Sequence, residues 1–369
     1  MTRPPVLLLV AAAACAAPKR VPRLWDDAEL STWATPVAGL GRPPTFASSA
    51  EYYAAPVDNL RTYPVYHPDH EPPGYRALLL RQGPRPLIEP ERLRTQADWI
   101  AAGERVFEEL DAPDSRSADP RVLAHFSSAA SIDAYRDAHH DVMTRDGILL
   151  DYRWVVDRDG KLKVSLSSCA GCHTRLMPDG TALRGAPANY DLAKSPATQL
   201  LLDGFRRILG LPLGAELYAA FGVPWLGDDA HARFRAMSDA GVEGFLAQET
   251  GEPPGTLFAR FNGSLLYPTR MGDLRGIRHR RYLDATGTFA NRGPADVARY
   301  GILVEYADLG RFGEHHMLPP RAERVRFRPA DEAMYAMALY LWSLDPPASP
   351  HPVDEHARRG AQVLSLIHI

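Results

Sequence analysis

The stretch "SSCAGCHTRLMPDG", residues 167–180, places Cys169, Cys172 and His173 in the pattern C-x-x-C-H. The chain of 369 residues has only three cysteines, so two of them would rarely fall into this arrangement by chance. Two thiols at this spacing, followed directly by an imidazole, are typical of covalent haem attachment. The motif therefore predicts one haem c, bound covalently by the cysteines and coordinated at its iron by His173.

Two other uses of a C-x-x-C pair fit the sequence less well. A structural zinc ion needs four ligands, and the chain has no second cysteine pair. A redox dithiol is expected next to a βαβ pattern, which is missing here. The third cysteine, Cys15, lies in an N-terminal apolar run and is not expected to pair with either of the others.

The N-terminal run "MTRPPVLLLVAAAACAA" carries one basic residue, a short apolar segment and then small residues. It is too short to span a bilayer and predicts a signal peptide over residues 1–19. Cys15 follows three alanines and resembles the lipobox of bacterial lipoproteins, so lipidation of Cys15 and simple cleavage after an A-x-A site are the two alternatives. We expect an exported protein, periplasmic or outer-membrane-anchored, which agrees with haem attachment outside the bacterial cytoplasm.

The composition is that of a globular protein, with 45% hydrophobic and 24% charged residues. A net charge of −3 gives no indication of a nucleic-acid surface. Residues 20–94 are rich in both proline and aromatic residues. Because disordered segments lack aromatics, we expect an extended arm that packs on the main domain.

Two amphipathic segments frame the motif, "WIAAGERVFEELD" at residues 99–111 and "DEAMYAMALYLWSL" at 331–344. They resemble the N- and C-terminal helices of class I cytochromes c, which cross closely at a glycine, here Gly103, next to the ring of Tyr340. We therefore expect a mainly α, class I cytochrome c-like helical domain over residues 95–349. Long loops and two β-hairpins, at residues 151–168 and 174–185, would be insertions in it.

The C-terminal residues 350–363 predict the start of a second cytochrome c domain, because Gly360-Ala361-Gln362-Val363 repeats the pattern of residues 103–106. Leu364 to Ile369, read back into codons, match one frame of the transposon end sequence used to build sequencing libraries. The hypothesis is that these six residues are a sequencing-adapter artefact, which would exclude His368 as a ligand. A natural apolar C-terminus is the alternative.

Three segments, "SCAGCHTRLMPDG", "NRGPADVARYGIL" and "ALYLWSLDPP", resemble parts of the large bacterial di-haem c-type cytochromes. The layout is most similar to the rubber-oxygenase-like group, which is related to the di-haem cytochrome c peroxidases. The resemblance covers roughly residues 95–363 and implies a second haem motif after them. In that group one haem can keep an open face that activates oxygen while the other relays electrons. Only Cys169, Cys172 and His173 carry over from the resemblance.

The residue on the distal face of the iron decides the chemistry, because a doubly ligated haem transfers electrons and an open face binds oxygen or peroxide. Met317, in "EHHMLPP", is the candidate distal ligand, since it precedes the final helix as the distal methionine of small cytochromes c does. His315 and His316 are alternatives, as is an open or water-bound face. Met177 follows His173 too closely to reach the distal side.

Two further groups of polar residues are candidate neighbours of the haem. The pair His139-His140 could lie behind the site or on a solvated helix face. The basic run "RMGDLRGIRHRRY" could bind haem propionates or form a surface charge cluster; its arginines are Arg270, Arg275, Arg278, Arg280 and Arg281.

The sequence thus predicts a periplasmic c-type cytochrome that transfers single electrons to or from a redox partner protein or a small-molecule oxidant. The alternative is a haem peroxidase or dioxygenase that acts at an open distal haem face. No phosphate-binding loop, nucleophile elbow or dinucleotide fingerprint points to another class of enzyme.

Overall fold

The computed structural model of the protein describes residues 21–36, 43–139, 143–189, 236, 238, 256–257, 269–270, 272–284, 287–305, 309–312, 315–316, 327–348 and 351–367. The predicted signal peptide, with Cys15, lies outside these residues, as do Met317, His140 and His368.

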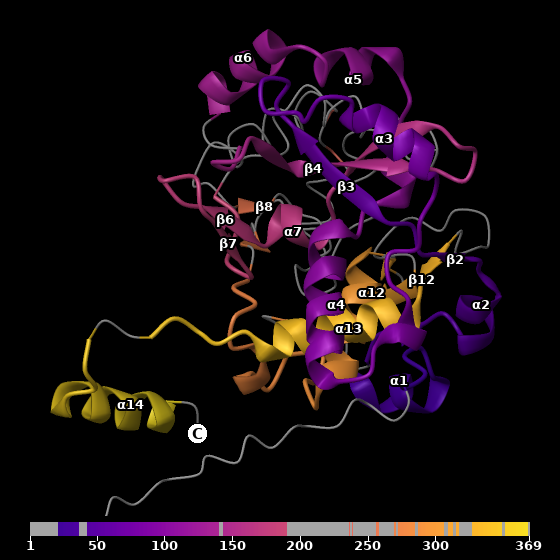
Figure 1. Ribbon diagram of the computed structural model, residues 1–369. Helices are drawn as coiled ribbons and strands as arrows, with labels where there is room; N and C mark the ends of the chain where they lie inside the picture. Colours follow the sequence, from indigo (N-terminus) through magenta and orange to yellow (C-terminus); the bar gives the residue numbers. More distant parts are fainter. Residues whose placement is uncertain are drawn as a thin grey trace, which may run out of the picture.

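Helices and strands are mixed along the described part of the chain (Figure 1). The helices are α1 (Asp27–Trp33), α2 (Ser49–Ala54), α3 (Tyr75–Gln82), α4 (Gln96–Glu109), α5 (Pro120–His125), α6 (Ala129–His139), α7 (Cys169–Cys172), α12 (Pro294–Glu305), α13 (Asp331–Ser343) and α14 (Glu355–Ile367). The strands are β1 (Thr45–Phe46), β2 (Val57–Asp58), β3 (Thr62–Tyr66), β4 (Ile148–Val156), β5 (Leu162–Leu166), β6 (Thr174–Leu176), β7 (Ala182–Arg184), β8 (Thr256–Leu257), β9 (Thr269–Arg270), β10 (Gly310–Phe312), β11 (His315–His316) and β12 (Arg328–Pro329).

The crossing of α4 with α13 forms the centre of what we call the helical half, which also includes α12 and residues 21–36 and 43–54 (Figure 1). A Cβ atom on Gly103 would lie 1.9 Å from the carbonyl oxygen of Ala336 and 2.9 Å from the Cβ of Tyr340. Only glycine allows this approach, because any side chain would collide with backbone. The predicted close crossing at Gly103 is present.

The two crossing helices form for different local reasons. Thr95 and Asp98 make a capping box at the start of α4, which satisfies the first backbone N–H groups of the helix. The apolar face of α4 then buries Val106 and Phe107. In contrast, α13 is apolar nearly all round and is buried over most of its length, as expected for a helix inside a core.

The first part of the proline-rich arm, residues 21–36 and 43–54, is an integral part of the helical half. Trp25 and Trp33 are fully buried. The backbone N–H of Leu24 donates to Asp331 Oδ2 at 3.1 Å, and the indole N–H of Trp33 donates to the carbonyl of Ala290 at 3.1 Å. The described residues of the arm form short helices and strands that hold these contacts in place.

The strands β3, β4 and β5 form an antiparallel sheet that we call the sheet half, together with α5 and α6. Tyr152 and Trp154 of β4 point into a second core, where their rings pack on Phe126 with centroids 4.6 and 6.1 Å apart. The opposite face of β4 is buried as well, so the strand is covered on both sides. The two predicted hairpins, now seen as β4–β5 and β6–β7, are confirmed.

The described residues form several β-sheets as well as helices, so the fold is mixed α/β and the predicted mainly α, class I cytochrome c-like fold is wrong. The hairpin β4–β5 is not an insertion, because β3 from the arm pairs with it to make a sheet with its own core. The sequence hides β3 because Pro64 lies inside it. Proline is tolerated there since β3 is an edge strand and its register shifts between Pro64 and Val65.

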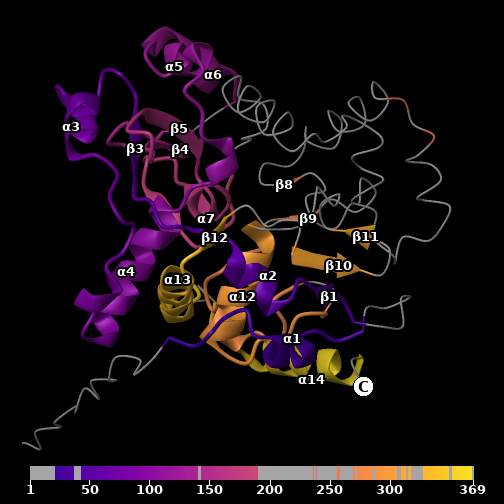
Figure 2. The same ribbon diagram turned by 90° about the vertical axis from the view of Figure 1, so that its right-hand side faces the viewer.

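Helix α7 lies where the two halves meet, between the β3–β4–β5 sheet and the helices α12 and α13 (Figures 1 and 2). It contacts α4 on one side and β4 on the other. The fold therefore places the C-x-x-C-H motif at the boundary between two cores.

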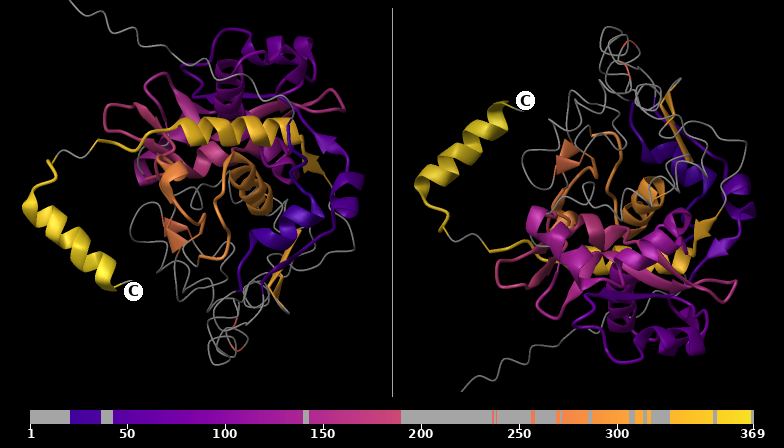
Figure 3. Two further views of the ribbon diagram at one scale, coloured as in Figure 1. Left: turned by 90° about the horizontal axis from the view of Figure 1, so that it is seen from below. Right: turned by 90° about the horizontal axis from the view of Figure 1, so that it is seen from above.

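Helix α14 stands away from the rest of the described chain (Figure 3). Residues 351–364 are all exposed. The helix covers the residues in which a second domain was predicted to begin, which stays a prediction. Within the described residues, none of the helices combines the length and the apolar character needed to cross a bilayer.

Candidate functional site

The two cysteines of the motif lie on one helical turn. The backbone N–H of His173 donates to the carbonyl of Cys169 at 3.0 Å, which closes the turn. Residues three and four apart share a helix face, so both thiols and the start of the His173 side chain point to the same side. Cys169 and Cys172 do not form a disulfide, and each is partly exposed, which makes the two thiols accessible to a bound group.

The segment before the turn is fixed by both halves of the molecule. The N–H of Ser167 donates to the carbonyl of Asp151 in β4 at 2.8 Å. The N–H of Ser168 donates to the carbonyl of Leu110, directly after α4, at 3.2 Å. The hydroxyl oxygens of Ser167 and Ser168 are buried and have no hydrogen-bond partner among the described residues. Polar atoms of this kind are expected next to a group or a water molecule that completes the site.

The segment after the turn is fixed by the β6–β7 hairpin. The N–H of Gly185 donates to the carbonyl of His173 at 2.8 Å, and the N–H of Ala188 donates to that of Cys172 at 3.1 Å. Gly185 has a φ of 80°, a conformation that favours glycine. The motif is therefore held by backbone hydrogen bonds on both sides, which restricts the directions of its side chains.

The imidazole of His173 is oriented by a backbone carbonyl that lies far away in the sequence. Nδ1 of His173 is 3.0 Å from the carbonyl oxygen of Gly272. With the proton on Nδ1, the ring donates to this carbonyl and its lone pair is on Nε2, the atom that can bind a metal. This arrangement is the usual one for a metal-binding histidine.

These donors fit a covalently bound haem c. They supply two thiols on one turn, an imidazole oriented by the carbonyl of Gly272, and an anchored backbone. A metal ion held by protein side chains alone is not indicated, because no group of three or more His, Cys, Asp or Glu residues in the described ranges could hold one.

The side chains of the candidate distal ligands lie outside the part of the chain that the structure describes. Met317 lies outside them, so its role stays a prediction. His315 and His316 form β11, which pairs with β10, but their side chains are outside the described part of the structure. His139 ends α6, and its side chain is likewise not described.

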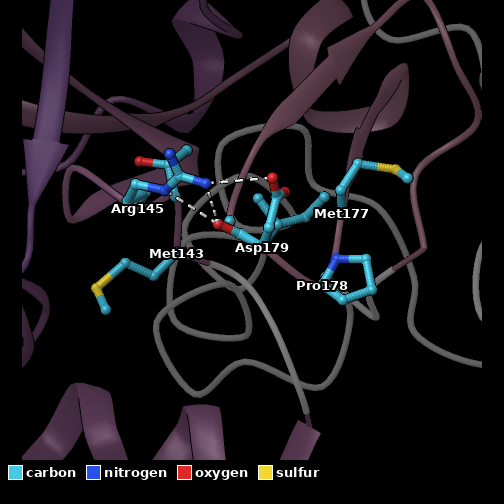
Figure 4. A pocket seen from close by; sticks show the side chains of 8 residues that line it. Met143, Arg145, Met177, Pro178 and Asp179 are labelled. Atoms are coloured by element: carbon cyan, nitrogen blue, oxygen red, sulfur yellow. Dashed lines mark hydrogen bonds and ion pairs between the residues drawn. The ribbon is translucent and has the colours of Figure 1, made fainter.

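Met177 and its neighbours line a shallow pocket of about 300 Å³ beside the β6–β7 hairpin (Figure 4). Met143 and Met177 point away from each other across it, and Arg145 pairs with Asp179 at 3.2 Å. Because that ion pair balances the two charges of the pocket, no group in it is left with an obvious chemical role. Met177 is exposed at the hairpin turn.

Three arginines of the basic run have partners in the protein. Arg275 pairs with Asp273 at 2.6 Å, and Arg280 donates to the carbonyl of the same residue. Arg278 pairs with Asp345. These contacts favour a surface charge cluster over binding of haem propionates.

Sequence reasoning missed two neighbours of the motif, Gly272 and Met337. Gly272 acts through its carbonyl, and a backbone atom leaves no signal in a sequence. Met337 lies in the amphipathic segment 331–344, whose pattern predicts only a helix packed on a core, whereas its Sδ lies 3.4 Å from Cys169 Sγ. Both contacts depend on long-range packing that no local pattern shows.

Comparisons of this chain with protein-family models, with curated proteins and with solved structures find no match. The resemblance to di-haem cytochromes therefore rests on the sequence motifs alone.

Proposed function

We propose that this chain is an exported c-type cytochrome that binds one haem covalently through Cys169 and Cys172 and transfers single electrons. The observation that supports it best is the combination of two cysteine thiols on one turn with an imidazole oriented by the Gly272 carbonyl. A zinc-binding histidine would use the same orienting bond, but a structural zinc ion needs four ligands, and no group of three or more His, Cys, Asp or Glu residues in the described ranges could hold a metal ion.

Each residue of the motif has a distinct part in this proposal. The bound haem supplies an iron that gains and loses one electron. Each thiol would be added across one vinyl group, forming an S–C bond while the thiol hydrogen goes to the neighbouring carbon, so that no net oxidation would be needed. Nε2 of His173 is the proximal ligand, and the hydrogen bond from Nδ1 to Gly272 fixes the ring and increases its basicity.

The test is the covalent link itself. The protein is produced in a bacterial host that attaches haem c, and haem staining follows acid extraction and denaturing electrophoresis. The wild type is expected to stain, and the double substitution Cys169→Ala/Cys172→Ala to lose the stain. Cys15→Ala is the matched control, because it removes a cysteine outside the motif. A wild type without covalent haem would overturn the proposal.

Carbon monoxide separates electron transfer from oxygen chemistry at the same haem. A relay with two protein ligands is expected to bind carbon monoxide slowly or not at all in the ferrous state, whereas rapid stoichiometric binding would indicate an open face. Met317→Ala tests the candidate ligand, since an unchanged ferric spectrum would rule Met317 out.

The proposed location is the periplasm or the outer membrane, with Cys15 as the site of lipid attachment in the second case. The partner would be a redox protein or a small-molecule oxidant. The resemblance to the di-haem group adds a second haem domain that begins near residue 350, and sequencing of the gene past codon 363 tests this.

A further inference from the structure

The two thiols of the motif have different surroundings. Cys169 packs against the main hydrophobic core, where its Sγ is 3.4 Å from the Sδ of Met337 on α13. Cys172 is followed by His173 and is tied through its carbonyl to Ala188, on the side of the β6–β7 hairpin. One attachment point is therefore next to the core and the other is next to a surface hairpin.

Met337 is held in position by the packing of its side chain against Gly301 of α12. Its side chain is 2% exposed. A Cβ atom on Gly301 of α12 would lie 3.1 Å from Met337 Cε and 3.0 Å from Met334 Cε. The absence of a side chain at Gly301 thus makes room for both methionine methyl groups between α12 and α13. Met337 fills the space between Gly301 and Cys169, so it cannot withdraw from the thiol without repacking both helices.

We propose that Met337 is a positioning residue that seals the Cys169-linked edge of the haem against water. The inference rests on the proposed haem attachment and goes further, because it assigns the two ring edges different environments. The edge at Cys169 is closed by an apolar thioether, and exchange with a redox partner takes place on the side of Cys172 and the hairpin.

Met337 would then raise the reduction potential of the haem. Ferric haem carries one more positive charge than ferrous haem, and an apolar wall stabilises that charge less than water does. Met337 therefore favours the ferrous form. If Met337 is shortened, water reaches the Cys169 edge and the reduction potential falls.

Two substitutions on the same helix test this, Met337→Ala and Met334→Ala. Both remove the same atoms from a buried position next to Gly301, but the 3.4 Å sulfur contact with Cys169 is made by Met337. In the holoproteins, the midpoint potential is measured by spectroscopic titration, and stability is measured by urea unfolding. We expect similar losses of stability, and a fall in potential for Met337→Ala that is clearly larger than for Met334→Ala.

The leucine pair, Met337→Leu and Met334→Leu, serves if the alanine variants do not fold. Leucine keeps the site apolar, so neither leucine variant is expected to change the potential. Equal potentials in the two alanine variants would overturn the inference, as would a fall in Met337→Leu, since it would show that sulfur contact and not water exclusion matters. A wild type without covalent haem would instead overturn the proposed function, and the staining assay detects that separately.

Discussion

The helical half and the sheet half contribute to the same site, but they are specified in different ways. In the helical half, a capping box, an apolar face and Gly103 are local features that position α4 on α13. In the sheet half, β4 and β5 become part of a sheet only when β3 arrives from the arm. The comparison shows that local patterns predict helices and hairpins well, whereas the core around a hairpin depends on a partner far away in the sequence.

Arg116 joins the two halves through three carboxylates. Its guanidinium is 2.7 Å from Asp111 and 2.7 Å from Asp58, and it is 3.5 Å from Asp157. Asp111 directly follows Leu110, which anchors Ser168, and it also forms a β-bridge with Ser167. The buried ion cluster therefore supports the segment that leads into α7.

The largest effect is expected for Arg116→Ala. Removal of the cation leaves Asp58 and Asp111 as buried, unbalanced carboxylates, and loss of one partner of a buried ion pair costs about 4 kcal/mol of unfolding free energy. Urea unfolding measures this loss, and staining is expected to show less covalent haem. The control is Arg121→Ala, whose exposed pair with Asp119 is worth at most about 1 kcal/mol. Equal losses in the two variants would contradict the role of Arg116.

Gly103→Ala tests the helical half. The added Cβ meets the backbone oxygen of Ala336, which cannot move without separating α4 from α13, so we expect a loss of about 3 kcal/mol. Gly360→Ala in α14 is the matched control, because nothing lies within 4 Å of its Cβ position. A melting temperature for Gly103→Ala that equals that of the wild type would mean that the crossing is looser than described.

Asp296 of α12 is paired with arginines that connect α12 to the arm. The titration of Asp296 therefore tests the helical half through the dependence of its stability on pH. Burial alone would raise the pKa of Asp296, but hydrogen bonds from Arg292 hold the pKa below the ordinary 3.8. Arg299 pairs with the same carboxylate at 2.5 Å and donates to the carbonyl of Leu24 at 2.7 Å. A depressed pKa contributes stability that is present above the unfolded pKa and is lost as the pH falls through the folded one.

We therefore expect Asp296→Asn to lose about 2 kcal/mol at neutral pH, through its weaker bonds to two arginines. The variant should also lose part of the fall in stability that the wild type shows below about pH 4, the range set by the depressed pKa. Urea unfolding at several pH values measures both effects, with Glu91→Gln at an exposed position as the control. Identical pH profiles for the wild type and Asp296→Asn would show that this carboxylate does not hold the arm.

The smallest effect is expected for Met177→Leu. The side chain is 38% exposed at the β6–β7 turn, and an apolar replacement there should change stability by less than about 0.5 kcal/mol. Because Met177 follows His173 too closely to reach the distal side, the visible spectrum of the proposed haem protein should not change either. A change in the ferric spectrum would place Met177 near the iron and would contradict this view of the hairpin.

Much of the framework could be predicted because it has local causes. The glycine at the crossing, the turn at Gly160 and the two hairpins all have sequence signals, and the structure contains them. The class of fold could not be predicted, since Pro64 hides β3 and the sheet exists only through its pairing with β4. The contacts of His173 with Gly272 and of Cys169 with Met337 could not be predicted either, because they join residues that are far apart in the sequence.

The attachment of the arm has a consequence for how the chain becomes folded. The bond from Leu24 to Asp331 joins residues 307 positions apart, and the one from Arg299 to Leu24 spans 275 positions. Contacts of such long sequence separation form late, because a large loop must close before they contribute. We expect Trp25 and Trp33 to stay without a core until the last helices have been synthesised, and refolding from denaturant to be slow. Late folding of this kind keeps a chain extended for longer, which would help its passage through a translocation channel if the chain is exported as proposed.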